Sequence, residues 1–266
     1  MKLWRHPAKA RASRLPAVED VPAPSLLLGL VGLAGVLFLI YWIQGYVRRA
    51  LAMPVREEEH TQAPQQPPPE ADVPPEAAVG TPIQKKEDGE GLLYHRHYSV
   101  TIADPEMSAE ELMATMQADP NPFSPQLLAR FEKTKGEEGQ MAVGDEYFIH
   151  ITGPWNGPVR VTEVTPTSFA FVTLEGHLEA GEIHFEAAPH PERANALHFE
   201  IYSWARSRDQ AVRFAYEVAG IAKSAQTSMW ANWCRCVVEE SGGELVGEIE
   251  IVTEKNEIAD ENPNAD

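Results

Sequence analysis

The chain has 266 residues, with 40 acidic against 22 basic side chains and a formal net charge of −18 at pH 7. An acidic surface repels phosphate backbones, so we expect no nucleic-acid partner. The length allows one or two domains. The two cysteines, Cys234 and Cys236, lie two positions apart in a predicted helix, where they would point away from each other, so we expect no disulfide between them.

The chain opens with a basic tail, residues 1–25, followed by an apolar segment. Residues 26–43 carry no charge, and extension to Tyr46 gives about 20 residues, enough to cross a hydrocarbon core of roughly 30 Å. Aromatic rings at 41, 42 and 46 precede Arg48 and Arg49, as is typical of a membrane interface. We therefore predict one transmembrane helix over 26–46, with the lipid bilayer as its partner.

A cleaved signal peptide is the alternative, because Ala50-Leu51-Ala52 resembles a cleavage site. The apolar core is long for a signal peptide, however, and two arginines separate it from that site. A short, strongly basic tail is costly to translocate. We expect a single-pass membrane protein with its globular domain on the non-cytoplasmic side.

Two further segments are predicted to be disordered. Residues 47–90 are rich in proline, with the triplet 67–69 and the pair 74–75, and this composition is typical of an extended linker. Residues 251–266 form an acidic tail nearly free of large apolar side chains.

Residues 91–250 remain as one globular domain. A strand is predicted over 97–103. A helix follows at the capping box of Ser108 and Glu111, and a second short helix is predicted from Ser124-Pro125 through Phe131. Strands are then predicted at 147–151, 159–164, 169–174, 182–186 and 197–202.

The last element of this domain is a long helix over 207–240. It is predicted to open at a second capping box, residues 207–210, and to end at Gly242-Gly243. The element order indicates an α+β fold in which an antiparallel sheet wraps around a long C-terminal helix, the helix-grip or START-like arrangement. Such folds often leave a cavity between sheet and helix.

One stretch of the chain resembles a known family, the uncharacterised domain of unknown function number nineteen-ninety, over about 140–240. The run Thr173-Leu174, Gly176-His177, Glu179, Gly181-Glu182 and Phe185 carries the resemblance, with support from 144–145, 158–161 and 169–171. Val172 and Leu178 depart from the family's usual residues. The resemblance implies a fold and carries no activity.

The same run supplies the candidate site. A histidine beside carboxylates suits proton transfer or ligand contact, whereas polar residues in a glycine-flanked turn often only hydrogen-bond the backbone. We expect ligand-binding residues at Gly176, His177, Glu179, Glu182 and Trp204, and we assign no catalytic residue and no cofactor.

Two other groupings were weighed as sites. If residues 182–186 and 197–201 pair with Ile183 and Phe185 inward, His184 falls opposite His198 and Glu182 opposite Glu200. Two histidines and two carboxylates resemble a metal site, but a solvated sheet face predicts the same residues, so we expect no metal. The aromatic residues that could line or simply fill a cavity are Trp204, Phe214, Trp230 and Trp233.

These observations favour a membrane-anchored module that binds an apolar or amphipathic small molecule or a lipid. A structural or assembly protein without a ligand, displayed on a stalk, is the alternative. An enzyme of hydrolase or cyclase type that uses His177 and Glu182 is a third hypothesis, less favoured than the other two. The sequence indicates no oligomeric state.

Overall fold

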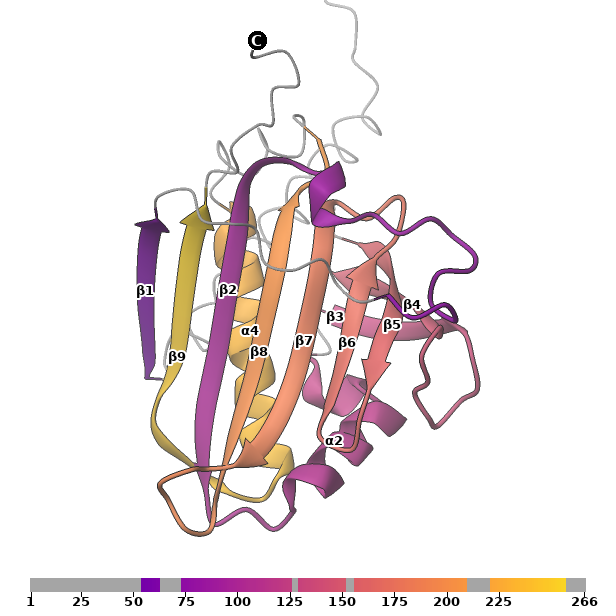
Figure 1. Cartoon of the computed structure of the whole chain (residues 1–266). Coiled ribbons are helices and arrows are strands. Elements are labelled where there is room, and N and C mark those ends of the chain that lie inside the picture. Colours follow the sequence, from indigo (N-terminus) through magenta and orange to yellow (C-terminus); the bar gives the residue numbers. More distant parts are fainter. Residues whose placement is uncertain (1–53, 63–72, 126–128, 152–155, 210–220, 257–266) are drawn as a thin grey trace, which may run out of the picture. The chain divides into compact units, whose positions relative to one another are not determined.

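The computed structural model describes residues 54–62, 73–125, 129–151, 156–209 and 221–256. The chain divides into two units, 1–46 and 47–266, and every described residue belongs to the second. The strands of the described part form one mixed sheet in the order β1-β9-β2-β8-β7-β6-β5-β4-β3 (Figure 1). Their bounds are β1 Val55–Gln62, β2 Glu90–Ala103, β3 Ala129–Lys135, β4 Glu146–Ile151, β5 Gly157–Val164, β6 Ser168–Thr173, β7 Glu179–Pro189, β8 Ala196–Ser207 and β9 Glu244–Asn256.

The sheet is antiparallel except at one edge, where β1 pairs with β9 in parallel. Helix α4, Ile221–Glu240, crosses one face of the sheet behind β2 and β8 (Figure 1). We call this the inner face. Because successive side chains of a strand point to opposite faces, Phe199 and Ile201 lie on the inner face, where they are fully buried. The predicted alternation of this strand is therefore confirmed, and the face opposite α4 is called the outer face.

The capping box at Ser108 is also confirmed. Helix α2, Ala109–Ala118, begins where Ser108 Oγ accepts a hydrogen bond from the Glu111 N–H at 3.2 Å, and the Glu111 carboxylate accepts one from the Ser108 N–H at 2.8 Å. The helix buries Leu112 and Met113 against the inner-face core. This reciprocal pairing satisfies two N–H groups that a helix terminus leaves open.

The second short helix, predicted from Ser124 through Phe131, is wrong at its C-terminal end, and residues 126–128 in its middle lie outside the described residues. A 3-10 turn, Asn121–Phe123, precedes Ser124, and Phe131 lies in strand β3 instead. Ala129 and Phe131 are buried while Arg130 and Glu132 are exposed, so burial follows the period of two that defines a strand. A proline at a first helical position allows a helix but does not require one. Pairing with β4 holds residues 129–135 in an extended conformation.

The start of the long helix was also predicted wrongly. Ser207 ends strand β8, where it pairs with Glu90 on one side and Glu179 on the other. The helix as described starts at Ile221, and residues 210–220 lie outside the described residues. Cys234 and Cys236, both buried in α4, are free thiols, as expected.

The predicted linker and tail contain ordered segments. Strand β1 and residues 73–89 fall in the predicted linker, and β9 extends past 250 into the predicted tail. Residues 73–89, here called the strap, include a 3-10 turn at Lys86–Asp88 and bury Ala77 completely. The strap is held by Arg160 of β5, which is fully buried and donates hydrogen bonds to the carbonyls of Ala77 and Thr81, each at 2.9 Å.

Within the described ranges, no helix is both long and apolar enough to cross a membrane. The transmembrane helix predicted over 26–46 lies outside the described residues.

Candidate functional site

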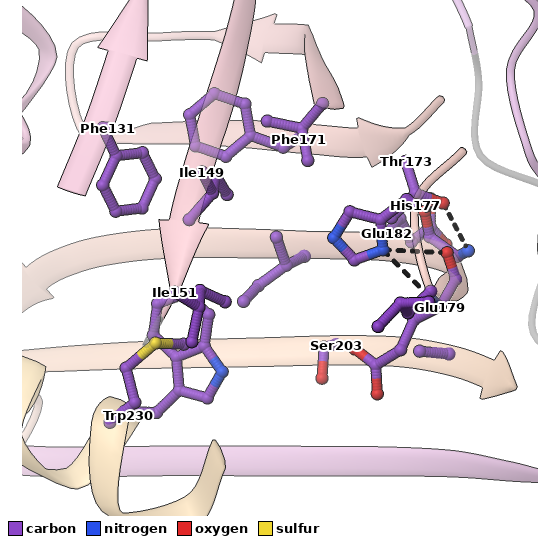
Figure 2. Close-up of a pocket in the computed structure, with 16 residues that line it drawn as sticks. Phe131, Ile149, Ile151, Phe171, Thr173, His177, Glu179, Glu182, Ser203 and Trp230 are labelled. Atoms are coloured by element: carbon purple, nitrogen blue, oxygen red, sulfur yellow. Dashed lines mark hydrogen bonds between the residues drawn. The ribbon is translucent and has the colours of Figure 1, made fainter. Parts of the chain in front are cut away.

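A partly enclosed cavity of about 90 Å³ lies between α4 and the inner face of the sheet. Strands β3 to β8 line one side of it, and Met229 and Trp230 of α4 line the other. Figure 2 shows Trp230 on the helix side of the cavity. Most of the lining side chains are apolar, and they include Phe131, Ile149 and Phe171. A binding site of this kind is typically apolar, with a few polar groups that fix the orientation of the ligand.

The apolar lining is backed by a network of packed rings. Phe185 lies with its ring centroid 4.6 Å from Phe169, 5.6 Å from Trp230 and 5.3 Å from Trp233. Phe131 meets Trp233 edge-on at 5.4 Å. Aromatic packing of this kind holds the cavity wall in place.

The polar groups of the cavity gather near the turn that joins β6 to β7. Gly176 has φ of +99°, a left-handed conformation that favours glycine, and the His177 N–H then closes the turn on the Leu174 carbonyl at 3.0 Å. The His177 ring packs directly over Gly157, where an added Cβ would lie 2.0 Å from Cδ2. His177 is therefore held in one position, with 8% of its surface exposed.

The His177 ring is held by backbone rather than by a carboxylate. The Glu179 N–H donates to Nδ1 at 2.9 Å (Figure 2). Burial lowers the pKa of His177 below its ordinary value of 6.5, and the nearby Glu179 carboxylate opposes this only in part. The ring is therefore neutral near pH 7.

The strap braces this turn from the other side. The Gln84 side-chain amide donates to the carbonyls of His177 at 3.0 Å and Glu179 at 2.8 Å. The Thr173 hydroxyl donates to the Gln84 carbonyl at 2.8 Å and accepts from the Gly181 N–H at 3.0 Å. Because these groups are buried, each carbonyl depends on its partner in the protein.

A charged pair lies beside the same end of the cavity. Arg96 of β2, only 3% exposed, places Nη1 3.7 Å from the carboxylate of Glu179. Ser203, which also lines the cavity, is the strand partner of Arg96. The polar end therefore combines a neutral imidazole, a hydroxyl and a paired carboxylate.

Three of the five predicted ligand-binding residues, Gly176, His177 and Glu179, meet at this turn. The other two point elsewhere. Glu182 borders the cavity, but its carboxylate lies on the outer face, 3.8 Å from Lys86 Nζ and 3.8 Å from His184 Nε2. Trp204, its strand partner, also lies on the outer face, stacked on His95 with ring centroids 3.6 Å apart.

The side chains of His177 and Glu182 therefore do not share one site, and the proposed acid–base pair is not assembled. Within the described ranges, no group of three or more metal-ligating side chains is arranged for a metal ion. The pairing that would have grouped Glu182, His184, His198 and Glu200 is shifted, because His184 pairs with Tyr202 and Glu200 with Glu186.

The four aromatic candidates also separate. Trp230 lines the cavity, Trp233 fills the core behind it with 1% exposure, and Trp204 lies on the outer face. Phe214 lies outside the described residues.

Sequence reasoning missed Gln84, Arg96, Ser203, Lys86 and Arg160. Arg160 stood in the family motif, and a cation inside an apolar strand run could have flagged it as a buried anchor. The two carbonyls that the Gln84 side chain binds lie 93 and 95 residues away, and no local pattern could have identified it.

Comparison with known proteins places the chain in one family. The model of the family described as Domain of unknown function (DUF1990) matches residues 95–235. No curated protein matches the chain.

Several solved structures are similar to it. A conserved protein from Geobacillus kaustophilus is 13% identical, with 57% of this chain and 98% of that chain covered and a TM-score of 0.39. The Zhui aromatase/cyclase from Streptomyces sp. R1128 is 14% identical, with 56% and 94% covered and a TM-score of 0.43. Norcoclaurine synthase from Thalictrum flavum, in complex with dopamine and hydroxybenzaldehyde, is 11% identical, with 60% and 94% covered and a TM-score of 0.40. At TM-scores below 0.5, none of these likenesses identifies an activity for this chain.

Proposed function

The chain belongs to the family described as Domain of unknown function (DUF1990), and we propose that its globular domain binds an apolar or amphipathic small molecule between the sheet and α4. The observation that carries this proposal is the cavity itself, with apolar walls and a polar end. An apolar cavity gains little by holding water, so an apolar ligand is its favoured occupant.

The size of the cavity bounds the ligand. At about 90 Å³ it is smaller than the roughly 150 Å³ that admits a benzene molecule. Because it is only partly enclosed, a larger ligand, from a substituted benzene to a lipid, would place one portion inside and extend toward solvent. The helix-grip arrangement, in which a sheet curves around its last helix, is part of this proposal, since that arrangement leaves space between sheet and helix.

The membrane belongs to the proposal as well. Residues 26–46 would anchor the chain to a bilayer, with the globular domain on the non-cytoplasmic side. A bilayer is a local source of apolar molecules, so the anchor would keep the module close to its ligand.

Native mass spectrometry of the full-length chain, isolated in nanodiscs without refolding, tests this function. We expect an added small-molecule mass that is lost on organic extraction. Ala205→Leu would fill space in the cavity wall and should abolish that mass. Ala188→Leu, on the opposite face of the neighbouring strand, should retain it. A clean apo mass that no lipid or small apolar molecule shifts would contradict the proposal and favour a structural role without a ligand.

A further inference from the structure

The polar end of the cavity contains a hydrogen-bond donor whose protonation state the geometry determines. The Glu179 N–H points at His177 Nδ1 at 2.9 Å, and the Glu179 carbonyl oxygen lies 3.1 Å from the same nitrogen. Because a backbone N–H can only donate, the direction of this N–H assigns the lone pair to Nδ1. A neutral imidazole then carries its proton on Nε2. The lowered pKa that burial gives His177 agrees with a neutral ring.

The Nε2–H group is available to a ligand. Among the described residues, no side chain or carbonyl accepts from it, and the ring borders the cavity. Figure 2 shows this second ring nitrogen on the side of the ring away from the hydrogen-bonded turn, toward Ile149 and Phe171. A ligand oxygen placed there would accept a hydrogen bond from Nε2–H, which stabilises the bound ligand.

The charges around this donor restrict what the ligand can carry. The Glu179 carboxylate is already paired with Arg96 at 3.7 Å, and His177 is neutral. Arg208, the other cation that acts on His177, is paired with Asp209 at 2.8 Å. An anionic head group would therefore enter a buried region whose nearby cations are already paired, at a large desolvation cost. An ammonium group offers only donors and cannot accept from Nε2–H.

The hydroxyl of Ser203 adds a second neutral contact. It lines the cavity on β8 and accepts or donates as the ligand requires. A ligand hydroxyl can donate to Ser203 or accept from it, and a ligand carbonyl can accept from it.

We propose that the ligand presents an uncharged oxygen, either a hydroxyl or a carbonyl, to Nε2–H of His177, and that the cavity selects neutral alcohols or ketones over carboxylates and amines. This inference rests on the proposed binding function and adds the chemical class of the head group. It gives His177 a binding role, without proton transfer.

The test compares four probes that share a benzene ring with one carbon substituent and differ in the head group: benzyl alcohol, benzoate, benzylamine and toluene. Each is titrated near neutral pH into the full-length chain in nanodiscs, at measured free aqueous concentrations. The signal is the ¹³C methyl resonance of Met229, which lines the cavity, with the core methyl of Met113 as reference. Since the signal is specific to the cavity wall, partition of a probe into lipid does not mimic binding.

We expect benzyl alcohol to bind about tenfold more tightly than benzoate or benzylamine, the ratio expected from one buried hydrogen bond and an avoided charge. His177→Phe keeps an aromatic ring and removes the donor, so it should weaken benzyl alcohol about tenfold and leave toluene unchanged. Ser203→Ala should weaken benzyl alcohol by a smaller factor.

Each outcome separates this inference from the function on which it rests. Equal or tighter binding of benzoate or benzylamine in the unaltered protein would overturn the neutral-oxygen proposal while the binding function stands. Equal loss of toluene and benzyl alcohol in His177→Phe would overturn the role of Nε2–H. If none of the probes shifts the Met229 methyl, the binding function itself fails.

Discussion

The two faces of the sheet differ in what they do with the same short stretch of chain. Between Gly176 and Phe185, the inner face receives His177, Glu179 and Phe185, which border or back the cavity. The outer face receives Glu182 and His184, which join Lys86 in an ionic cluster. The side chains of this one sequence motif therefore lie in two separate environments, one on each face of the sheet.

The outer face is polar and organised by histidine–carboxylate pairs. His97 lies 2.7 Å from Glu200, His198 lies 3.5 Å from the same oxygen of Glu200, and His95 lies 3.0 Å from Glu254. The inner face buries phenylalanine and tryptophan instead. We therefore expect the packing of the inner face to contribute most of the stability, and the charges of the outer face to contribute mainly to its pH dependence.

The largest difference in stability is expected between substitutions of two neighbouring residues of β7, one on each face of the sheet. Phe185→Ala removes a fully buried ring that contacts two tryptophans and should lower the free energy of unfolding by roughly 3–5 kcal/mol. His184→Ala removes a part-exposed ring stacked on Tyr202 and should cost under about 1 kcal/mol. Urea titration of both variants measures the difference, and similar losses would contradict the assignment of the two faces.

The next largest effect is expected where the strap is attached. Arg160→Met removes the donors to two strap carbonyls and the guanidinium 2.7 Å from the Glu146 carboxylate, which keeps only the exposed Lys135 at 3.5 Å. We expect a loss of about 3 kcal/mol and faster hydrogen exchange over 77–84. Arg130→Met is the control, because Arg130 pairs with Glu132 on an exposed surface and should change stability by less than about 0.5 kcal/mol. Unchanged exchange in the strap of Arg160→Met would show that other contacts hold it.

Much of this architecture was predictable because its signals are local. The alternation of apolar and polar residues predicts strand β8, and the capping box predicts the start of α2, which the structure reproduces. Strand β3 was missed because Phe131 stands among polar residues, and its conformation depends on pairing with β4. The edge strand β1 and its neighbour β9 carry many glutamates, so their composition predicted a linker and a tail.

The candidate site was predictable only where chain neighbours form it. His177 and Glu179 share one turn, and the motif found both. Placing Phe185 inward already sends Glu182 outward, three positions away, so the strand period contradicted the pairing of His177 with Glu182. The partnership of Glu179 with Arg96, and of the turn with Gln84, joins distant segments and requires the fold.

A smaller loss of stability is expected at Gln84, which connects the strap to the turn that carries His177. Gln84→Ala removes the donor to two carbonyls of the His177 turn and should cost about 1–2 kcal/mol. Gln117→Ala is a matched control, since Gln117 also donates to two backbone carbonyls, those of Thr165 and Ser168, at a different turn. Both should destabilise the protein similarly, whereas only Gln84→Ala should weaken benzyl alcohol binding. Equal binding by the two variants would separate the strap from the cavity.

The smallest effect expected is the pH response of the outer face. Hydrogen bonds from His198 and His97 lower the pKa of Glu200 from 4.5 to about 2. Between those values the unfolded chain binds more protons than the folded protein, so the free energy of unfolding falls as the pH is lowered through this window.

Glu200→Gln removes this titration. On lowering the pH below 4.5, the free energy of unfolding of this variant should fall by about 1 kcal/mol less than that of the unaltered protein. The value is small because solvent screens a part-exposed pair. His198→Gln should remove only part of it, because His97 still lies 2.7 Å from the carboxylate. Urea titrations at several acidic pH values measure the slopes. A Glu200→Gln slope as steep as that of the unaltered protein would place the acid response elsewhere, including at His177 on the inner face. Because the pKa of His177 is lowered in the folded protein, the unfolded chain binds more protons below pH 6.5. A fall in the free energy of unfolding that begins near pH 6.5 and is absent in His177→Phe would assign the acid response to the inner face.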